Sequence, residues 1–152
     1  MKVTFTPTTS DDAETLVQIR IEAMRESLER LGRFDPARAR ERFLASFDPA
    51  FCRFILVEEI KAGFVLLRPQ SDHLLLDHLY ITPAHQGNGV GAAVLHAVLA
   101  EADALALPVR LGALRDSDSN RFYRRHGFVK SAESEWDIYY VREPKKASGG
   151  GR

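Results

Sequence analysis

The sequence has little of what would place it in several common classes of protein. Cys52 is the single cysteine in 152 residues, which excludes an internal disulfide and any zinc site built on several thiolates. The 21 basic and 21 acidic residues give a formal net charge of zero, so a basic, nucleic-acid-coating surface is not indicated. No apolar run approaches the roughly 20 residues that cross a membrane, and the N-terminus lacks the apolar segment of a signal peptide. We therefore expect a cytoplasmic protein that acts without nucleic acid, membrane or metal.

The length and the ends of the chain predict its domain organisation. A chain of 152 residues is long enough to bury one hydrophobic core, and we expect a single domain over 1–143. The end of the sequence, 144–152, is polar and glycine-rich, a composition that predicts a disordered tail. Cys52 lies in the apolar run 51–57 and is expected to be a core residue rather than a nucleophile.

The most informative stretch is 85–91, which follows an apolar run ending at Ile81 and precedes a helical apolar pattern. Its glycines occupy alternate positions: Gly87, Gly89 and Gly91. Glycines there let the backbone approach a ligand and adopt positive φ. The first turn of the following helix offers unpaired N–H groups and a positive dipole end, a combination that suits phosphate. The stretch predicts a pyrophosphate site for a nucleotide-containing cofactor; the alternative is a tight turn in which Gly91 is small for packing.

The glycine spacing excludes two common nucleotide folds. A dinucleotide fold has G-x-G-x-x-G near its first strand and an acidic residue about 20 positions later, whereas Glu101 and Asp103 fall inside the continuing helical pattern. A phosphate loop of the G-x-x-x-x-G-K-[ST] type is excluded because no lysine follows these glycines.

The rest of the chain predicts an α+β protein with the element order β-α-α-β-β-β-α-β-α-β-β. The expected strands cover 2–7, 52–58, 63–68, 74–81, 109–114, 128–131 and 138–141. The expected helices follow the cap residues at 8–12, run from 36 to about 47, from 90 to about 105 and from 117 to 125. The first helix is expected to stop at Gly32, and residues 58–61 are expected to form a turn. The strands on either side of the long helix are expected to be parallel.

Two motifs resemble those of the GNAT acetyltransferase superfamily. Residues 79–91 are similar to the family's strand followed by Q/R-x-x-G-x-G/A, and residues 120–128 are similar to its F-Y-x-x-x-G-F. The resemblance implies a three-layer α/β/α fold with a mixed, mostly antiparallel central sheet of seven strands and helices on both faces. It implies an N-acetyltransferase that moves the acetyl group of acetyl-CoA to a primary amine of a small molecule or peptide. A homodimer is expected from this resemblance alone.

The resemblance also implies which residues hold the cofactor. The strand ending at Ile81 and the strand beginning at Val109 would splay apart, and acetyl-CoA would lie in the split. Main-chain groups of Leu79, Tyr80 and Ile81 would bond its pantetheine arm like an added strand. The pyrophosphate would be held by main-chain amides of Gln86, Gly87, Asn88, Gly89, Val90, Gly91 and Ala92. Asn120 would lie near the cofactor from the other side.

Tyr123 matches the family tyrosine whose hydroxyl approaches the CoA sulfur, so the resemblance implies that it is the general acid. The alternative is that Tyr123 packs beside Phe122, which is itself expected to be a core residue. N–H groups at the end of the 74–81 strand are expected to stabilise the oxyanion of the tetrahedral intermediate.

The general base is left open between two residues. Asp77 and His78 are polar groups in an otherwise apolar strand, where an unpaired polar group is costly to bury. Strand alternation puts Leu75, Asp77 and Leu79 on one face. Many family members have an acid or a histidine on this strand, but Leu75 stands where a glutamate is often found. Asp77 is the first candidate for the base and His78 the second, and either is alternatively a structural polar residue.

The sequence departs from the family pattern at one more position, and residues near its end are expected to surround the acceptor site. Asp116 stands where the family often has an asparagine, and Asn120 is expected to replace it. The loop between the last two strands is expected to wall the acceptor site with charged and aromatic residues, namely Glu133, Glu135, Trp136, Asp137, Tyr139 and Tyr140; core packing is the alternative for Trp136. A rival hypothesis is a non-catalytic acyl-CoA-binding regulatory module, which Leu75 favours and Tyr123 opposes.

Overall fold

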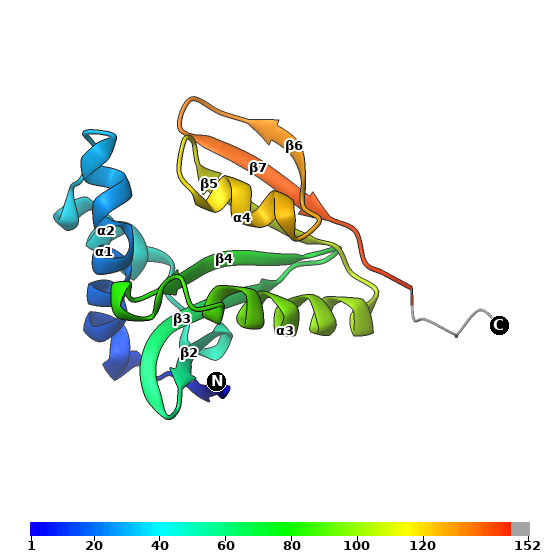
Figure 1. The fold of residues 1–152 in the computed structure, drawn as a ribbon, viewed down its shortest axis with the longest axis horizontal. Coiled ribbons are helices and arrows are strands. Elements are labelled where there is room, and N and C mark those ends of the chain that lie inside the picture. The colour runs from blue at the N-terminus through cyan, green and yellow to red at the C-terminus, as the bar shows by residue number, and fades with distance from the viewer. Residues whose placement is uncertain (147–152) are drawn as a thin grey trace. The chain divides into compact units, whose positions relative to one another are not determined.

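The computed structural model of the protein describes residues 1–146. Most of the tail predicted at 144–152 lies outside the described residues. The strands are β1 (Val3–Pro7), β2 (Cys52–Val57), β3 (Ile60–Pro69), β4 (Leu74–Ile81), β5 (Val109–Leu114), β6 (Val129–Glu133) and β7 (Asp137–Arg142). The α-helices are α1 (Ala13–Arg30), α2 (Pro36–Ser46), α3 (Val90–Leu105) and α4 (Ser119–Arg125), and three single turns of 3₁₀-helix cover Ser10–Asp12, Pro49–Phe51 and Pro83–His85. The predicted element order is confirmed (Figure 1).

The strands form one mixed sheet in the order β1-β2-β3-β4-β5-β7-β6. β4 and β5 run parallel, as expected for two strands joined through the long helix α3. The chain divides into two compact units: unit 1 consists of Met1–Leu66 and His78–Val94, and unit 2 consists of Leu67–Asp77 and the described residues from Leu95 onward. β3, β4 and α3 each contribute to both units.

The predicted signals at the ends of the first two helices are confirmed. Gly32 has φ +69°, and the amides of Gly32 and Arg33 close the end of α1 on the carbonyls of Glu29 and Leu28 at 3.0 and 2.8 Å. At the start of α2, Oδ1 of Asp35 accepts a hydrogen bond from the Arg38 amide at 3.1 Å.

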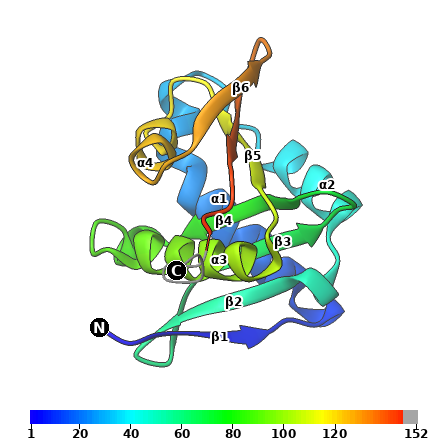
Figure 2. The same cartoon turned by 90° about the vertical axis from the view of Figure 1, so that its right-hand side faces the viewer.

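The core of unit 1 joins α1 and α2 to its strands. It contains Leu16, Val17, Ile19, Phe43, Cys52, Phe54, Phe64 and Leu66. Cys52 is 1% exposed, which confirms it as a core residue. β1 and β2 lie side by side as an antiparallel pair from Val3↔Val57 to Pro7↔Arg53 (Figure 2).

The turn between β2 and β3 is tighter than predicted. Val57 pairs with Ile60, so two residues, Glu58 and Glu59, make the whole turn and β3 begins earlier than position 63. Their φ angles are +49° and +69°, the left-handed conformation that two-residue hairpin turns require. Asparagine and glycine are the usual residues of that turn, so the two glutamates did not predict a two-residue hairpin. The Glu58 carboxylate accepts a hydrogen bond from the Lys2 amide at 2.9 Å.

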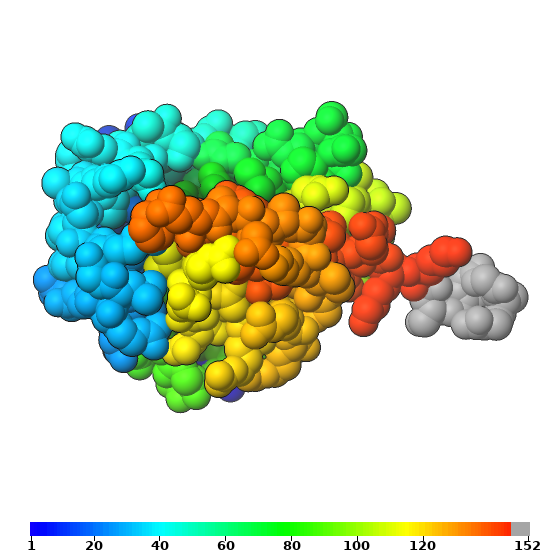
Figure 3. Space-filling model, turned by 90° about the horizontal axis from the view of Figure 1, so that it is seen from above, coloured from blue at the N-terminus to red at the C-terminus, as the bar shows by residue number. Residues whose placement is uncertain are grey.

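In unit 2, β5 pairs with β7 from Val109↔Arg142 to Leu114↔Asp137, and β7 pairs with β6. The last two strands are longer than predicted. β6 is irregular between Lys130 and Ala132, and all five of its residues are exposed, as its orange ridge shows (Figure 3).

Candidate active site

The glycine-rich loop of unit 1 has the backbone conformation that its sequence predicted. Gly87 and Gly89 have φ of +80° and +81°. A Cβ at either position would meet no atom within 4 Å, so positive φ, rather than packing, requires glycine there. α3 begins at Val90, and the first amides of a helix have no acceptor within it. The loop therefore leads into main-chain donors at the positive end of the α3 dipole.

Gln86 fixes this loop to the end of β4. Its Nε2 donates to the carbonyl of Ile81 at 2.8 Å, and its own amide donates to Pro83 at 3.3 Å. Oγ1 of Thr82 lies 3.1 Å from Nδ1 of His85. The amide of Gln86, predicted to hold pyrophosphate, is thus engaged in the 3₁₀ turn; Gly87 to Ala92 are the predicted donors that follow it.

β3 and β4 approach each other closely at Gly63. A Cβ on Gly63 would lie 2.0 Å from the carbonyl oxygen of Tyr80, which no side chain can tolerate. The amide of Thr82 donates to Ala62 at 2.8 Å. These contacts set the path of the main chain through Leu79 to Ile81, the segment predicted to bond the pantetheine arm.

His78 lies in an aromatic environment in unit 1. Its ring centroid is 5.2 Å from that of Phe43 and 6.0 Å from that of Phe64. Its Nδ1 lies 3.4 Å from Oη of Tyr80, and the same Oη accepts a hydrogen bond from Nε of Arg20 at 3.4 Å. Arg20 also donates to the carbonyl of Ala39 at 2.9 Å. An arginine of α1 thus links α2 and β4 through the Tyr80 hydroxyl.

Asp77, the other predicted base, belongs to unit 2 and is part of an ion pair. Its Oδ2 accepts a hydrogen bond from Nε of Arg68 at 2.9 Å, and the two side chains are 30% and 18% exposed. The ion pair provides the compensation that a half-buried carboxylate needs. On taking up a proton, Asp77 would give up most of this attraction.

Both polar atoms of the Asn120 side-chain amide form hydrogen bonds within unit 2. Nδ2 donates to the carbonyls of Leu114 at 2.8 Å and Ser117 at 3.0 Å. Oδ1 accepts a hydrogen bond from the Tyr140 hydroxyl at 2.8 Å, and Arg124 donates to that hydroxyl at 3.3 Å. Asn120 is 7% exposed. Its side chain therefore holds the start of α4 against the end of β5 and against β7.

Tyr123 lies one turn further along α4 and is 8% exposed. Its ring centroid is 5.2 Å from that of Phe122 and 5.6 Å from that of Phe128. Phe122, expected to be a core residue, is only half-buried, so the tyrosine is the more enclosed of the two. Nδ1 of His126 lies 2.9 Å from the Phe122 carbonyl near the end of α4.

Arg115 organises the loop between β6 and β7. Its guanidinium donates to Glu133 at 2.9 Å, to the Ser134 carbonyl at 2.7 Å and to the Glu135 carbonyl at 3.3 Å. Glu133 also forms an ion pair with Lys130. Trp136 is 50% exposed, so it is not the core residue that one reading expected.

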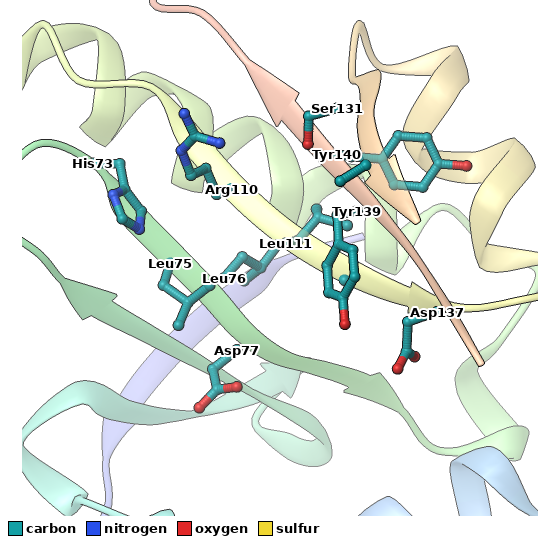
Figure 4. A pocket seen from close by; sticks show the side chains of 12 residues that line it. His73, Leu75, Leu76, Asp77, Arg110, Leu111, Ser131, Asp137, Tyr139 and Tyr140 are labelled. Carbon is teal, nitrogen blue, oxygen red and sulfur yellow. The ribbon is translucent and has the colours of Figure 1, made fainter. Parts of the chain in front are cut away.

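A cavity of about 530 Å³ opens on one face of unit 2. Pairing between β4 and β5 covers Leu74↔Val109 and Leu75↔Arg110, and both members of the second pair line the cavity. In Figure 4, His73 and Arg110 lie on one side, and Asp77 and Asp137 lie on the other. The Tyr139 ring lies over Gly112. A Cβ atom on Gly112 would come within 3.1 Å of that ring. The volume is within the range of small-molecule sites, about 300 to 1,000 Å³.

The predicted residues thus fall in both units. Unit 1 contains the main-chain segment 79–81, the loop 86–92 and His78, whereas unit 2 contains Asp77, Asn120 and Tyr123. The sequence reasoning missed the arginines that orient these residues: Arg20, Arg68 and Arg115. An arginine in a strand or a helix is an ordinary surface signal, and nothing local in the sequence marked these partners.

The comparisons with known proteins agree with this architecture. The family model described as an acetyltransferase (GNAT) domain matches residues 50–130, more than half of the chain. No curated protein is similar enough in sequence to match.

Solved structures share the fold. The PaiA N-acetyltransferase from Thermoplasma acidophilum, in complex with coenzyme A, has 15% identity and a TM-score of 0.76, and the match covers 94% of this chain and 99% of that one. The ribosomal-protein-S18-alanine N-acetyltransferase from Escherichia coli has 14% identity and a TM-score of 0.72, with 98% of each chain covered. Ard1 from Thermoplasma volcanium has 20% identity and a TM-score of 0.68, with 96% and 100% covered.

The fold and the glycine-rich loop define an acetyltransferase-type protein. The chain belongs to the GNAT acetyltransferases and is an enzyme of the N-acetyltransferase class. Within residues 1–146, none of the helices is long and apolar enough to cross a membrane. In the same residues, no three histidine, cysteine or acidic side chains are grouped closely enough to hold a metal ion.

Proposed function

We propose that the protein transfers the acetyl group of acetyl-CoA to the primary amine of a small molecule or peptide by direct transfer. The observation that carries this proposal is the loop conformation at Gly87 and Gly89, which leads directly into the first amides of α3. Such a helix start binds phosphate groups. Residues from Gly87 to Ala92 would hold the pyrophosphate, and main-chain groups of Leu79 to Ile81 would bond the pantetheine arm.

The reaction needs two proton movements. The amine must lose a proton before its nitrogen attacks the thioester carbon. The new carbon–nitrogen bond forms, the tetrahedral intermediate collapses, the carbon–sulfur bond breaks, and the CoA thiolate takes a proton. We assign that last proton to the hydroxyl of Tyr123, whose burial would keep bulk water from competing with it as a donor.

For the first proton we place His78 ahead of Asp77. Asp77 is paired with Arg68, and taking a proton would remove the charge that sustains this pair. His78 has a neutral partner in the Tyr80 hydroxyl. For Nε2 of His78 to take the proton, Nδ1 must carry the ring hydrogen and donate it to the Tyr80 hydroxyl oxygen, which also accepts a hydrogen bond from Nε of Arg20.

The test is release of free thiol from acetyl-CoA over a panel of primary amines and peptides, with the product checked by mass spectrometry. We expect release that depends on both acetyl-CoA and the amine. Tight binding of CoA without turnover on any amine would instead support the non-catalytic module.

A further inference from the structure

The cavity on unit 2 has unlike charges at its two sides, and this bears on the acceptor. Arg110 lines one side, and Asp137 lines the other (Figure 4). The two residues are on one face of the β5–β7 pair, because Arg110 pairs with Val141 and Asp137 with Leu114. The two residue pairs are four positions apart along β5, which places their backbones roughly 13 Å apart at about 3.3 Å per residue. The long arginine side chain can shorten that span.

Both charges are available to a ligand. Neither the guanidinium of Arg110 nor the carboxylate of Asp137 forms a hydrogen bond or ion pair with another side chain in residues 1–146. By contrast, Asp77 on this face is paired with Arg68 at 2.9 Å, and Nδ1 of His73 lies 2.7 Å from Oδ1 of Asp72.

One acidic residue, Asp72, acts electrostatically on Arg110 at its side of the cavity. A hydrogen bond from His73 is the main cause that holds the pKa of Asp72 below its usual value, and the charge of Arg110 is a minor one. Asp72 does not line the cavity, and its side chain is 83% exposed, so water screens it from Arg110. The guanidinium therefore remains a strong donor toward the cavity.

Between the two sides the surface suits a short aliphatic or peptide backbone. Leu75 and the exposed backbone at Gly112 form the floor, and the Tyr139 ring forms a wall. The Tyr139 hydroxyl points to the side that holds Asp77 and Asp137 (Figure 4). A phenol beside a carboxylate provides two acceptors for an ammonium group.

We propose that the acceptor is a molecule with an amine and a carboxylate several bonds apart, such as a short peptide or an ω-amino acid. Arg110 binds the carboxylate through its planar donor fork, and Asp137 with Tyr139 receives the amine. This inference rests on the proposed acetyl transfer and names the substrate class for it.

The experiment compares matched acceptors that differ in one group. The pairs are 6-aminohexanoate with hexylamine, and a dipeptide with its C-terminal amide. We expect kcat/KM with wild-type enzyme to be about 10- to 100-fold higher for the carboxylate-bearing member, the range of a charged, bidentate contact. Glycine, in which the two groups are adjacent, should be the poorer acceptor.

Three variants assign the preference to residues. Arg110→Gln should remove the difference within each pair, Arg110→Lys should retain part of it, and Arg121→Gln, an exposed arginine outside the cavity, should leave it intact. Asp137→Asn should lower kcat/KM for both members of each pair equally, because both have the amine.

Equal rates within the pairs, or a preference that survives Arg110→Gln, would overturn the inference while leaving acetyl transfer intact. Absence of transfer to every amine, with CoA still bound, would overturn the proposed function itself.

Discussion

The hydroxyl of Tyr140 donates a hydrogen bond to Oδ1 of Asn120 over 2.8 Å, and both side chains are buried. The bond joins β7 to α4, the helix that carries Tyr123. The sequence predicted Asn120 near the cofactor, but its amide is already committed to Tyr140, Leu114 and Ser117. The Asn120 side chain therefore connects α4 with the end of β5 and with β7, and its place near the cofactor stays a prediction.

Removing the side-chain amide of Asn120 should lower the free energy of unfolding. Asn120→Ala removes the side-chain hydrogen bonds to the carbonyls of Leu114 and Ser117 and leaves the buried Tyr140 hydroxyl without its acceptor, and we expect the free energy of unfolding to fall by about 1 to 3 kcal/mol. Urea denaturation followed by circular dichroism measures it. Arg121→Ala, on the exposed side of α4, is the matched control and should stay within about 0.5 kcal/mol of wild type. An Asn120→Ala protein of unchanged stability that loses CoA affinity would show instead that the side chain contacts the cofactor.

The role of the Tyr123 hydroxyl can be separated from its packing. Tyr123→Phe keeps the ring between Phe122 and Phe128 and removes the proton donor. We expect kcat to fall by about 100-fold or more, with the dissociation constant for CoA unchanged within about twofold. Equal loss of turnover and CoA affinity in Tyr123→Phe would make the hydroxyl structural.

The assignment of the base gives different pH profiles for the two candidates. If His78 takes the proton, His78→Gln should lower kcat/KM by about 100-fold at neutral pH and abolish the acid limb of the pH–rate profile. Asp77→Asn should keep that limb and chiefly lower stability, because it removes the carboxylate charge that pairs with Arg68. Loss of the limb in Asp77→Asn, with its retention in His78→Gln, would return the role to Asp77.

The lowered pKa of Asp103 predicts how the free energy of unfolding depends on pH. A hydrogen bond from Arg142, followed by the Lys145 amide, holds the pKa of Asp103 below its usual value; the amide bond is 2.8 Å long. A carboxyl with a lowered pKa contributes stability that is fully present above its unfolded pKa, about 3.9, and is lost as the pH falls through the folded value.

The measurement compares wild type with Asp103→Asn over pH. The difference in unfolding free energy should be constant from about pH 5 to 7 and should shrink below about pH 4. Arg142 is 6% exposed, so the difference at neutral pH should be roughly 1 to 3 kcal/mol. A difference that grows as the pH falls would contradict the ion-pair account. Glu101→Gln, an exposed carboxylate of the same helix, is the control.

Local signals in the sequence predicted the element order and the main-chain site. Gly32, Asp35 and the pair Gly87 and Gly89 each prescribe a backbone conformation that the structure contains, because a cap or a positive φ is decided within a few residues. The turn at Glu58–Glu59 has the same kind of backbone without the usual residues, and its position was therefore missed.

Side-chain partners could not be predicted in this way. Arg20 meets Tyr80 across 60 residues of sequence, and Arg115 meets Glu133 across 18. Such pairs depend on how strands and helices pack, which no local pattern records. The same limit applies to Asn120, whose commitment to Tyr140 appears only when α4 and β7 are in place.

The central claim is that main-chain groups of residues 87–92 hold the CoA pyrophosphate. Its most direct test is calorimetric titration of CoA into the intact protein and into Gly89→Val, which changes a residue at φ +81° with open space around it. We predict saturable one-site binding to wild type, and at least about a tenfold loss in Gly89→Val because a β-branched residue resists positive φ. Absence of CoA uptake by wild-type protein, or equal affinity of a folded Gly89→Val, would contradict the account.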